Sequence, residues 1–161
     1  MATARDLMTK HFHTIRPDAS VADAVRMFAH VRDEDRPRVF GLMVTDEEGR
    51  LVGIMSLYDI LVFVRPKHIH VWGVMRDGEV SELLEGMAER AQSVKVRDIM
   101  SAEVVSVTLE TNLMEILDLM IRKHVRRIPV LNGNRIEGIV YISDVFDHVA
   151  EKLCLRRGSS P

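Results

Sequence analysis

One sequence pattern occurs twice along this chain of 161 residues. The tetrad Arg5-Asp-Leu-Met8 returns 92 residues later as Arg97-Asp-Ile-Met100. The run Gly53-Ile-Met-Ser-Leu-Tyr-Asp59 returns 85 residues later as Gly138-Ile-Val-Tyr-Ile-Ser-Asp144. Self-similarity of this kind indicates copies of one supersecondary unit. The repeat therefore predicts two similar halves, over residues 3–65 and 95–155.

Each copy predicts the element order strand, helix, strand, strand, helix. Residues 13–16 and 104–107 are the short first strands. The first helices begin behind the N-caps Ser20 and Asn112, each with an acid three residues on, which is typical of a capping box. Apolar residues behind the caps recur at helical spacing and predict one buried stripe per helix. The stripes are Val21, Ala24, Val25 and Phe28, and Leu113, Ile116, Leu117 and Met120.

Two hairpins and a second helix complete the copies. The predicted strand pairs are 42–45 with 50–55 and 128–131 with 135–140. The second helices open at Ser56 and Tyr141, and the first of them ends before Pro66 because proline cannot continue a helix. The linker, residues 66–94, carries an apolar pattern that predicts a helix at about 79–92. The tail, residues 156–161, is expected to be frayed.

The length of each copy constrains how the two copies associate. A half-covered sheet in a copy of about 60 residues is marginally stable alone. We therefore expect the two copies to pack sheet to sheet and to share a core. The predicted fold class is α+β, with two pseudo-symmetric βαββα repeats and an extra helix in the linker between them.

Composition excludes several classes of protein. The single cysteine, Cys154, excludes an internal disulfide framework and a thiolate-rich metal site. A net charge of −2 gives no general field for nucleic acid or membrane surfaces. No apolar run is long enough to span a bilayer, and the N-terminus lacks the apolar core of a signal peptide. We expect a cytoplasmic protein with no membrane partner and no general nucleic-acid binding.

Ser56 and Asp59 stand three residues apart at the predicted start of a helix that follows an apolar strand. Backbone N–H groups at a helix N-terminus bind anions such as phosphate. A carboxylate on the same face can accept two hydrogen bonds from a ribose diol. An ordinary capping box explains the same two residues, so the sequence leaves both interpretations open.

A basic pair, Arg126 and Arg127, precedes the strand that begins at Ile128. Forked guanidinium donors at the mouth of a strand can clamp a phosphate. A solvated charge cluster is the alternative. Lys123 and His124 extend the cluster, which favours a local positive pocket in a nearly neutral chain.

The two glycine-to-aspartate runs, with His124-Val-Arg-Arg-Ile-Pro-Val130 before the second, resemble tandem cystathionine β-synthase (CBS) domains, the Bateman module. The resemblance covers roughly residues 3–65 and 95–155. It implies repeats packed by their sheets, with two clefts for adenosine-containing ligands such as AMP, ADP, ATP or S-adenosylmethionine, and no required cofactor. It also implies a stand-alone homodimer that regulates an unidentified protein effector and is not an enzyme.

The resemblance assigns roles to residues of one complete cleft. Ser56 and Asp59 would hold phosphate and ribose, and Arg126 and Arg127 would reach the phosphates from the other repeat. The base would be walled by Met8, His13 and Ile54.

The second cleft departs from the family's pattern. Tyr141 replaces the small hydroxyl residue, and Phe40-Gly41 stand where the basic pair belongs. Asp144 remains, with Arg38 close in sequence. We therefore expect one competent cleft and a second, weaker one.

The sequence thus predicts a regulatory module that senses an adenine nucleotide and passes a conformational change to a partner protein. A ligand-free dimerisation or assembly module is the alternative. No catalytic residue is expected, because no acid–base pair or nucleophile set converges in the sequence. No metal site is expected either, because His68 and His70 have no further ligand at suitable spacing.

Overall fold

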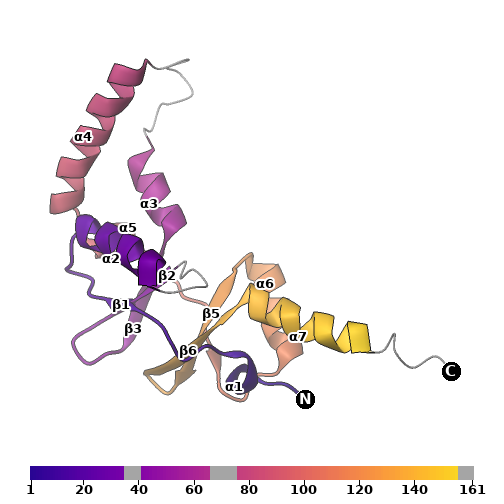
Figure 1. Ribbon diagram of the computed structural model, residues 1–161. Helices are drawn as coiled ribbons and strands as arrows, with labels where there is room; N and C mark the ends of the chain where they lie inside the picture. The colour runs from indigo at the N-terminus through magenta and orange to yellow at the C-terminus, as the bar shows by residue number, and fades with distance from the viewer. Residues whose placement is uncertain (35–40, 66–75, 156–161) are drawn as a thin grey trace. The chain divides into compact units, whose positions relative to one another are not determined.

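The computed structural model describes residues 1–34, 41–65 and 76–155, and the chain divides into two compact units (Figure 1). One unit is His13–Glu103, and the other joins Met1–Phe12 to Val104–Pro161. Each unit contains its own three-stranded sheet covered by helices. The predicted α+β class and the two similar repeats are confirmed.

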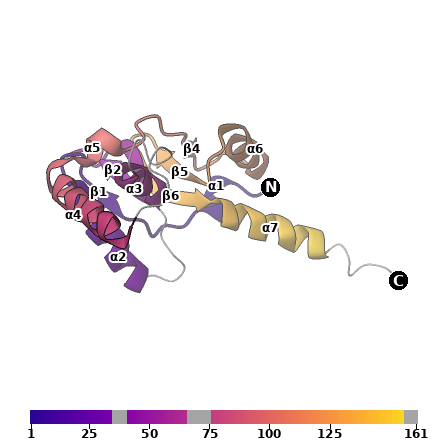
Figure 2. The same ribbon diagram turned by 90° about the horizontal axis from the view of Figure 1, so that it is seen from above.

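The unit of residues 13–103 is built on the sheet β1-β2-β3. Its elements are β1 (Thr14–Ile15), α2 (Val21–Glu34), β2 (Gly41–Thr45), β3 (Leu51–Ser56), α3 (Leu57–Val64), α4 (Asp77–Ser93) and α5 (Val96–Ile99). β1 pairs parallel with β2, and β2 pairs antiparallel with β3 through a turn in which Gly49 takes a φ of +79°. Phe28 of α2, Leu42 of β2 and Met55 of β3 meet in its core. The C-terminal part of the linker helix α4 packs against α2 (Figure 2).

The second unit repeats this plan on the sheet β4-β5-β6. Its elements are α1 (Ala4–Leu7), β4 (Val107–Thr108), α6 (Leu113–Lys123), β5 (Arg127–Asn132), β6 (Arg135–Tyr141) and α7 (Ile142–Leu155). β4 pairs parallel with β5, and β5 pairs antiparallel with β6. Ile116 and Met120 of α6 pack on Ile128 of β5 and Leu7 of α1 in its core.

The repeats exchange their leading segments. The tetrad at Arg5 forms α1, which precedes the first repeat in sequence but packs in the unit of the second. The tetrad at Arg97 forms α5, which packs in the unit of the first repeat. Each segment also forms a two-bond bridge to the last strand of its sheet. Thr9 bridges Ile139 with N···O distances of 2.8 and 3.0 Å, and Ser101 bridges Ile54 with 2.9 and 3.0 Å.

The structure corrects several details of the prediction. The first strands are only two residues long, and the second of them is shifted to Val107–Thr108. The tetrads form one-turn helices, which are too short to show a period. Val25 is 42% exposed instead of buried, because it lines an open groove between α2, α3 and α4. The helix predicted at 79–92 runs over Asp77–Ser93, and the tail lies outside the described residues.

Helix capping follows the predicted pattern, and Asn112 shows it most fully. Its side-chain oxygen accepts hydrogen bonds from the N–H groups of Met114 and Glu115, both at 3.0 Å, and its amide donates to the Glu115 carboxylate at 2.8 Å. Asn112→Ala should lower the free energy of unfolding by about 1 kcal/mol, since these groups lose their partner. Urea denaturation measures the change. Asn134→Ala, in the exposed β5–β6 turn, is the matched control and should stay within about 0.5 kcal/mol of the wild type.

Candidate functional site

Ser56 and Asp59 form a capping box at the junction of β3 and α3. The backbone N–H and the hydroxyl of Ser56 both donate to Oδ2 of Asp59, at 2.6 and 2.9 Å. The N–H of Asp59 donates back to the Ser56 hydroxyl at 3.3 Å. Both side chains are half-buried. The capping role is thus present in the structure, and it engages one oxygen of the Asp59 carboxylate.

The equivalent junction of β6 and α7 is built differently. The Tyr141 N–H donates to Oδ2 of Asp144 at 3.1 Å, but the residue in the place of Ser56 offers no short hydroxyl. Burial raises the pKa of Asp144, and the hydrogen bond from Tyr141 only partly opposes it. Burial also raises the pKa of Tyr141, although the positive charge of Arg127 acts to lower it. The Asp144 carboxylate therefore has fewer donors than Asp59 and is less well solvated than a free aspartate.

The basic pair lies at the start of β5, in the same unit as Tyr141 and Asp144. Arg127 is the first residue of β5, is half-buried and faces Tyr141 across the ladder. Arg126 is exposed, and its carbonyl accepts the Ile142 N–H at 2.9 Å. In the other unit the ladder position that faces Ser56 is Gly41. Within the described part of that unit, no arginine therefore stands beside Ser56 as Arg127 stands beside Tyr141.

The predicted base-walling residues divide between the units. His13 and Ile54 belong to the unit of Ser56, where Ile54 forms the bridge to Ser101 and the His13 carbonyl accepts the Met43 N–H at 3.0 Å. Met8 belongs to the other unit and lies against Gly138 of β6. Arg38 lies outside the described residues.

Sequence reasoning missed Met100 as a neighbour of the Ser56 strand. Its side chain lies against Gly53 of β3, as that of Met8 lies against Gly138 of β6. The signal was present in the repeat, because Met8 and Met100 end the two tetrads. Local sequence does not show that the leading segments are exchanged, so it does not place Met100 beside β3.

The structure groups the predicted residues into two sets. Ser56, Asp59, Ile54 and His13 lie in one unit, and Arg126, Arg127, Tyr141, Asp144 and Met8 lie in the other. A single cleft that joins Ser56 and Asp59 to the two arginines stays a prediction.

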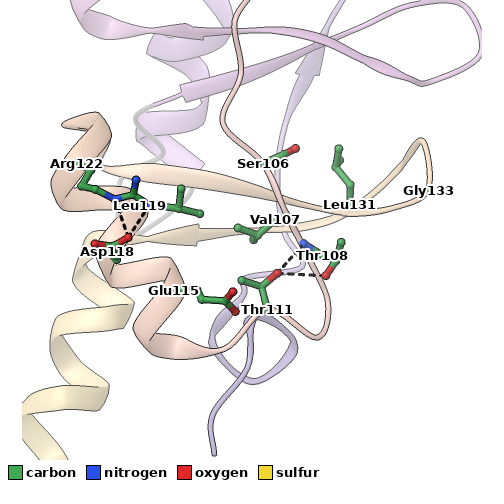
Figure 3. A pocket seen from close by; sticks show the side chains of 10 residues that line it. All are labelled: Ser106, Val107, Thr108, Thr111, Glu115, Asp118, Leu119, Arg122, Leu131 and Gly133. Atoms are coloured by element: carbon green, nitrogen blue, oxygen red, sulfur yellow. Dashed lines mark hydrogen bonds and ion pairs between the residues drawn. The ribbon is translucent and has the colours of Figure 1, made fainter.

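A cavity of about 540 Å³ lies beside α6, and none of the residues predicted to bind a ligand lines it (Figure 3). Its polar side chains pair locally. The hydroxyls of Thr108 and Thr111 lie 3.2 Å apart, and Arg122 donates to Asp118 at 2.7 Å. Because most of the polar side chains of this wall are paired with one another, the cavity gives no sign of a particular ligand.

Comparison with known proteins identifies the family. The CBS domain family matches residues 4–65 and 96–151, so this chain belongs to the CBS domain family and carries a tandem pair. Among the described residues, no helix combines the length and the apolar character needed to cross a bilayer.

Two solved structures similar to this chain contain nucleotides. CBSX2, a chloroplastic CBS domain-containing protein of Arabidopsis thaliana, was solved in complex with AMP. It is 26% identical, with a TM-score of 0.69 over 94% of this chain and 98% of that one. The cytosolic domain of the Mg²⁺ channel MgtE, solved with ATP, is 27% identical, with a TM-score of 0.66 over 90% of this chain and 48% of that one.

Some relatives are much longer than this chain. An uncharacterized 33.4 kDa protein of Thermofilum pendens is 29% identical over 116 residues. The match spans 72% of this chain but only 31% of that protein. The similarity to this relative therefore concerns about a third of its length.

Proposed function

We propose that this chain is a regulatory module that binds an adenine nucleotide and passes the resulting conformational change to a partner protein, without catalysing a reaction. The AMP complex of CBSX2 and the ATP complex of MgtE support an adenosine-containing ligand, since each matches at least 90% of this chain. AMP, ADP, ATP and S-adenosylmethionine are the ligands to test. The proposal places a homodimer in the cytoplasm and requires two arrangements of the repeats that differ in nucleotide affinity.

The proposed cleft unites Ser56 and Asp59 with Arg126 and Arg127. The observation that carries the proposal is the hydrogen bonding of the Asp59 carboxylate. Its Oδ2 accepts hydrogen bonds from both the N–H and the hydroxyl of Ser56, while no described residue donates to its Oδ1. A half-buried carboxylate oxygen without a donor can accept the hydroxyls of a ribose. The N-terminus of α3 and the two guanidinium groups would bind the phosphates.

The rest of the proposal concerns the base and the second cleft. Met8, His13 and Ile54 would flank the base. The second cleft, with Asp144, Tyr141 and Arg38, would bind more weakly, since a bulky phenol replaces the small hydroxyl and Gly41 faces Ser56 where Arg127 faces Tyr141.

A ligand-free assembly module is the second candidate. Leu61 on α3 and Phe146 on α7 occupy equivalent positions in the repeats and are 67% and 68% exposed. Large apolar side chains that are exposed at the same place in both repeats favour a surface for self-association.

A thermal-shift measurement distinguishes the two candidates. A nucleotide at a hundred times its dissociation constant should add about 2.7 kcal/mol to the free energy of unfolding and raise the melting temperature by several degrees. AMP, ADP, ATP and S-adenosylmethionine are compared with GMP as the control. No shift with any adenosine compound, in a protein that light scattering shows to be dimeric, would favour the assembly module.

A further inference from the structure

The outer edge of β3 is bridged by a residue of the second repeat. In the sheet order β1-β2-β3, β3 pairs with β2 on one side only. On its other side, Ile54 and Ser101 each donate the backbone N–H to the carbonyl of the other, at 3.0 and 2.9 Å. Ser101 lies in the segment 96–151, the second of the two that match the family. The first repeat by itself would therefore lack this bridge.

The cap of α3 lies at the same edge of β3. The hydrogen-bonding direction alternates along a strand, so Ile54 and Ser56 direct their backbone N–H groups to the same side. There the Ser56 N–H donates to Oδ2 of Asp59 at 2.6 Å. The bridge thus lies two residues, or about 7 Å, from the capping box along one edge of the strand.

The segment that carries Ser101 is itself held firmly. Val96 at the start of α5 is fully buried in the core that also contains Met55 of β3. A Cβ at Gly53 would come within 2.5 Å of Met100 Sδ, so the glycine leaves the room that the Met100 side chain occupies. The core at one end and β3 at the other fix the segment, which can therefore brace the strand.

We propose that the Ser101 backbone is a positioning element of the nucleotide site. Without the bridge, the end of β3 would be held by β2 alone, and strand ends with few hydrogen bonds open most readily. Groups that bind a ligand must be held within about 0.5 Å of their productive geometry. The bridge would hold Ser56 and Asp59 in that geometry for phosphate and ribose. The inference rests on the proposed function for its ligand.

Ser101→Pro tests the bridge, because it removes the N–H that donates to Ile54. Met100 already has the extended backbone that precedes a proline, with φ −65° and ψ 157°, and proline is common just after a helix C-cap. The affinity for AMP and ATP, measured by isothermal titration calorimetry, should fall about tenfold. Ser101→Ala keeps the N–H and should restore wild-type affinity. Ala102→Pro, whose N–H is bonded to no described residue, is the matched control and should bind within about twofold of wild type.

Hydrogen exchange of the unmodified chain gives a readout that a merely structural bridge would not move. Because bridge and nucleotide would stabilise the same strand end, saturating AMP or ATP should slow exchange of the Ser101 amide about tenfold. The Asp46 amide, which donates to the Arg50 carbonyl at 3.0 Å before the other end of β3, is the control and should slow less than about threefold. If Ser101→Pro does not fold, this measurement decides alone.

The outcomes separate this inference from the proposed function. A wild type that binds neither nucleotide would overturn both. A wild type that binds a nucleotide, with equal affinities in Ser101→Pro and Ala102→Pro, would overturn the positioning role alone. So would a Ser101 amide whose exchange slows no more than that of Asp46.

Discussion

Gly138→Ala is expected to lower the free energy of unfolding of its unit by about 3 kcal/mol. A Cβ at this position of β6 would come within 2.7 Å of the Thr9 carbonyl oxygen and 3.0 Å of Met8 Sδ. The Thr9 oxygen cannot retreat easily, because Thr9 exchanges two backbone hydrogen bonds with Ile139. The added methyl must therefore break the bridge or bend β6. Urea denaturation followed by circular dichroism measures the loss.

Two other glycines serve as controls for this prediction. At Gly53 a Cβ would come within 2.5 Å of Sδ in the flexible Met100 side chain and within 3.0 Å of the Ser101 carbonyl oxygen. Because this backbone contact is longer than the 2.7 Å contact at Gly138, Gly53→Ala should cost less, about 1–2 kcal/mol. At Gly86, inside α4, a Cβ would meet nothing within 4 Å, and Gly86→Ala should stabilise the helix by about 0.5–1 kcal/mol. Equal stability changes at Gly138 and Gly86 would contradict the close packing of the N-terminal segment on β6.

The repeat and its periodicity predicted most of the fold, and the failures have a common physical cause. Capping boxes, stripes and hairpin turns are local patterns, so Asn112 and its helix could be placed from sequence. The exchange of α1 and α5 depends on backbone hydrogen bonds between residues far apart, such as Thr9 and Ile139. Backbone groups are the same in every residue, so no pattern of side chains indicates such a pairing.

The candidate site was predictable in its residues but not in their local bonding. The spacing of Ser56 and Asp59 fits a capping box and a nucleotide site equally well, and the structure contains the box. The sequence already distinguishes the two repeats, because Tyr141 replaces the small hydroxyl and Gly41 stands where Arg127 stands in the other repeat. Which oxygen of Asp59 accepts the Ser56 donors depends on side-chain conformation, which the sequence does not show. Val25 shows the same limit, because its exposure depends on where α4 packs and not on its own helix.

Asp59→Ala is expected to lower adenine-nucleotide affinity at least a hundredfold, whereas Asp144→Ala should change it less than threefold. In the proposed cleft, Asp59 accepts two hydrogen bonds from the ribose, and each hydrogen bond to a charged group is worth about 1.5–3 kcal/mol. Asp144 lacks the serine partner, and burial raises its pKa, so its charged form is less favoured for binding a diol. Isothermal titration calorimetry with AMP or ATP measures both affinities.

Loss of the cap must be separated from loss of the ligand contact, because Asp59→Ala also removes the capping box of α3. Asp23 supplies the matched control, since it caps α2 in the same unit through the same reciprocal bonds to Ser20, each 3.1 Å long. Asp23→Ala should lower the free energy of unfolding by about 1 kcal/mol, as Asp59→Ala should, yet leave nucleotide affinity unchanged. If both variants weaken the nucleotide alike, Asp59 acts through the stability of its helix and not through the ribose. Equal losses at Asp59 and Asp144 would show instead that the two clefts bind the nucleotide equally.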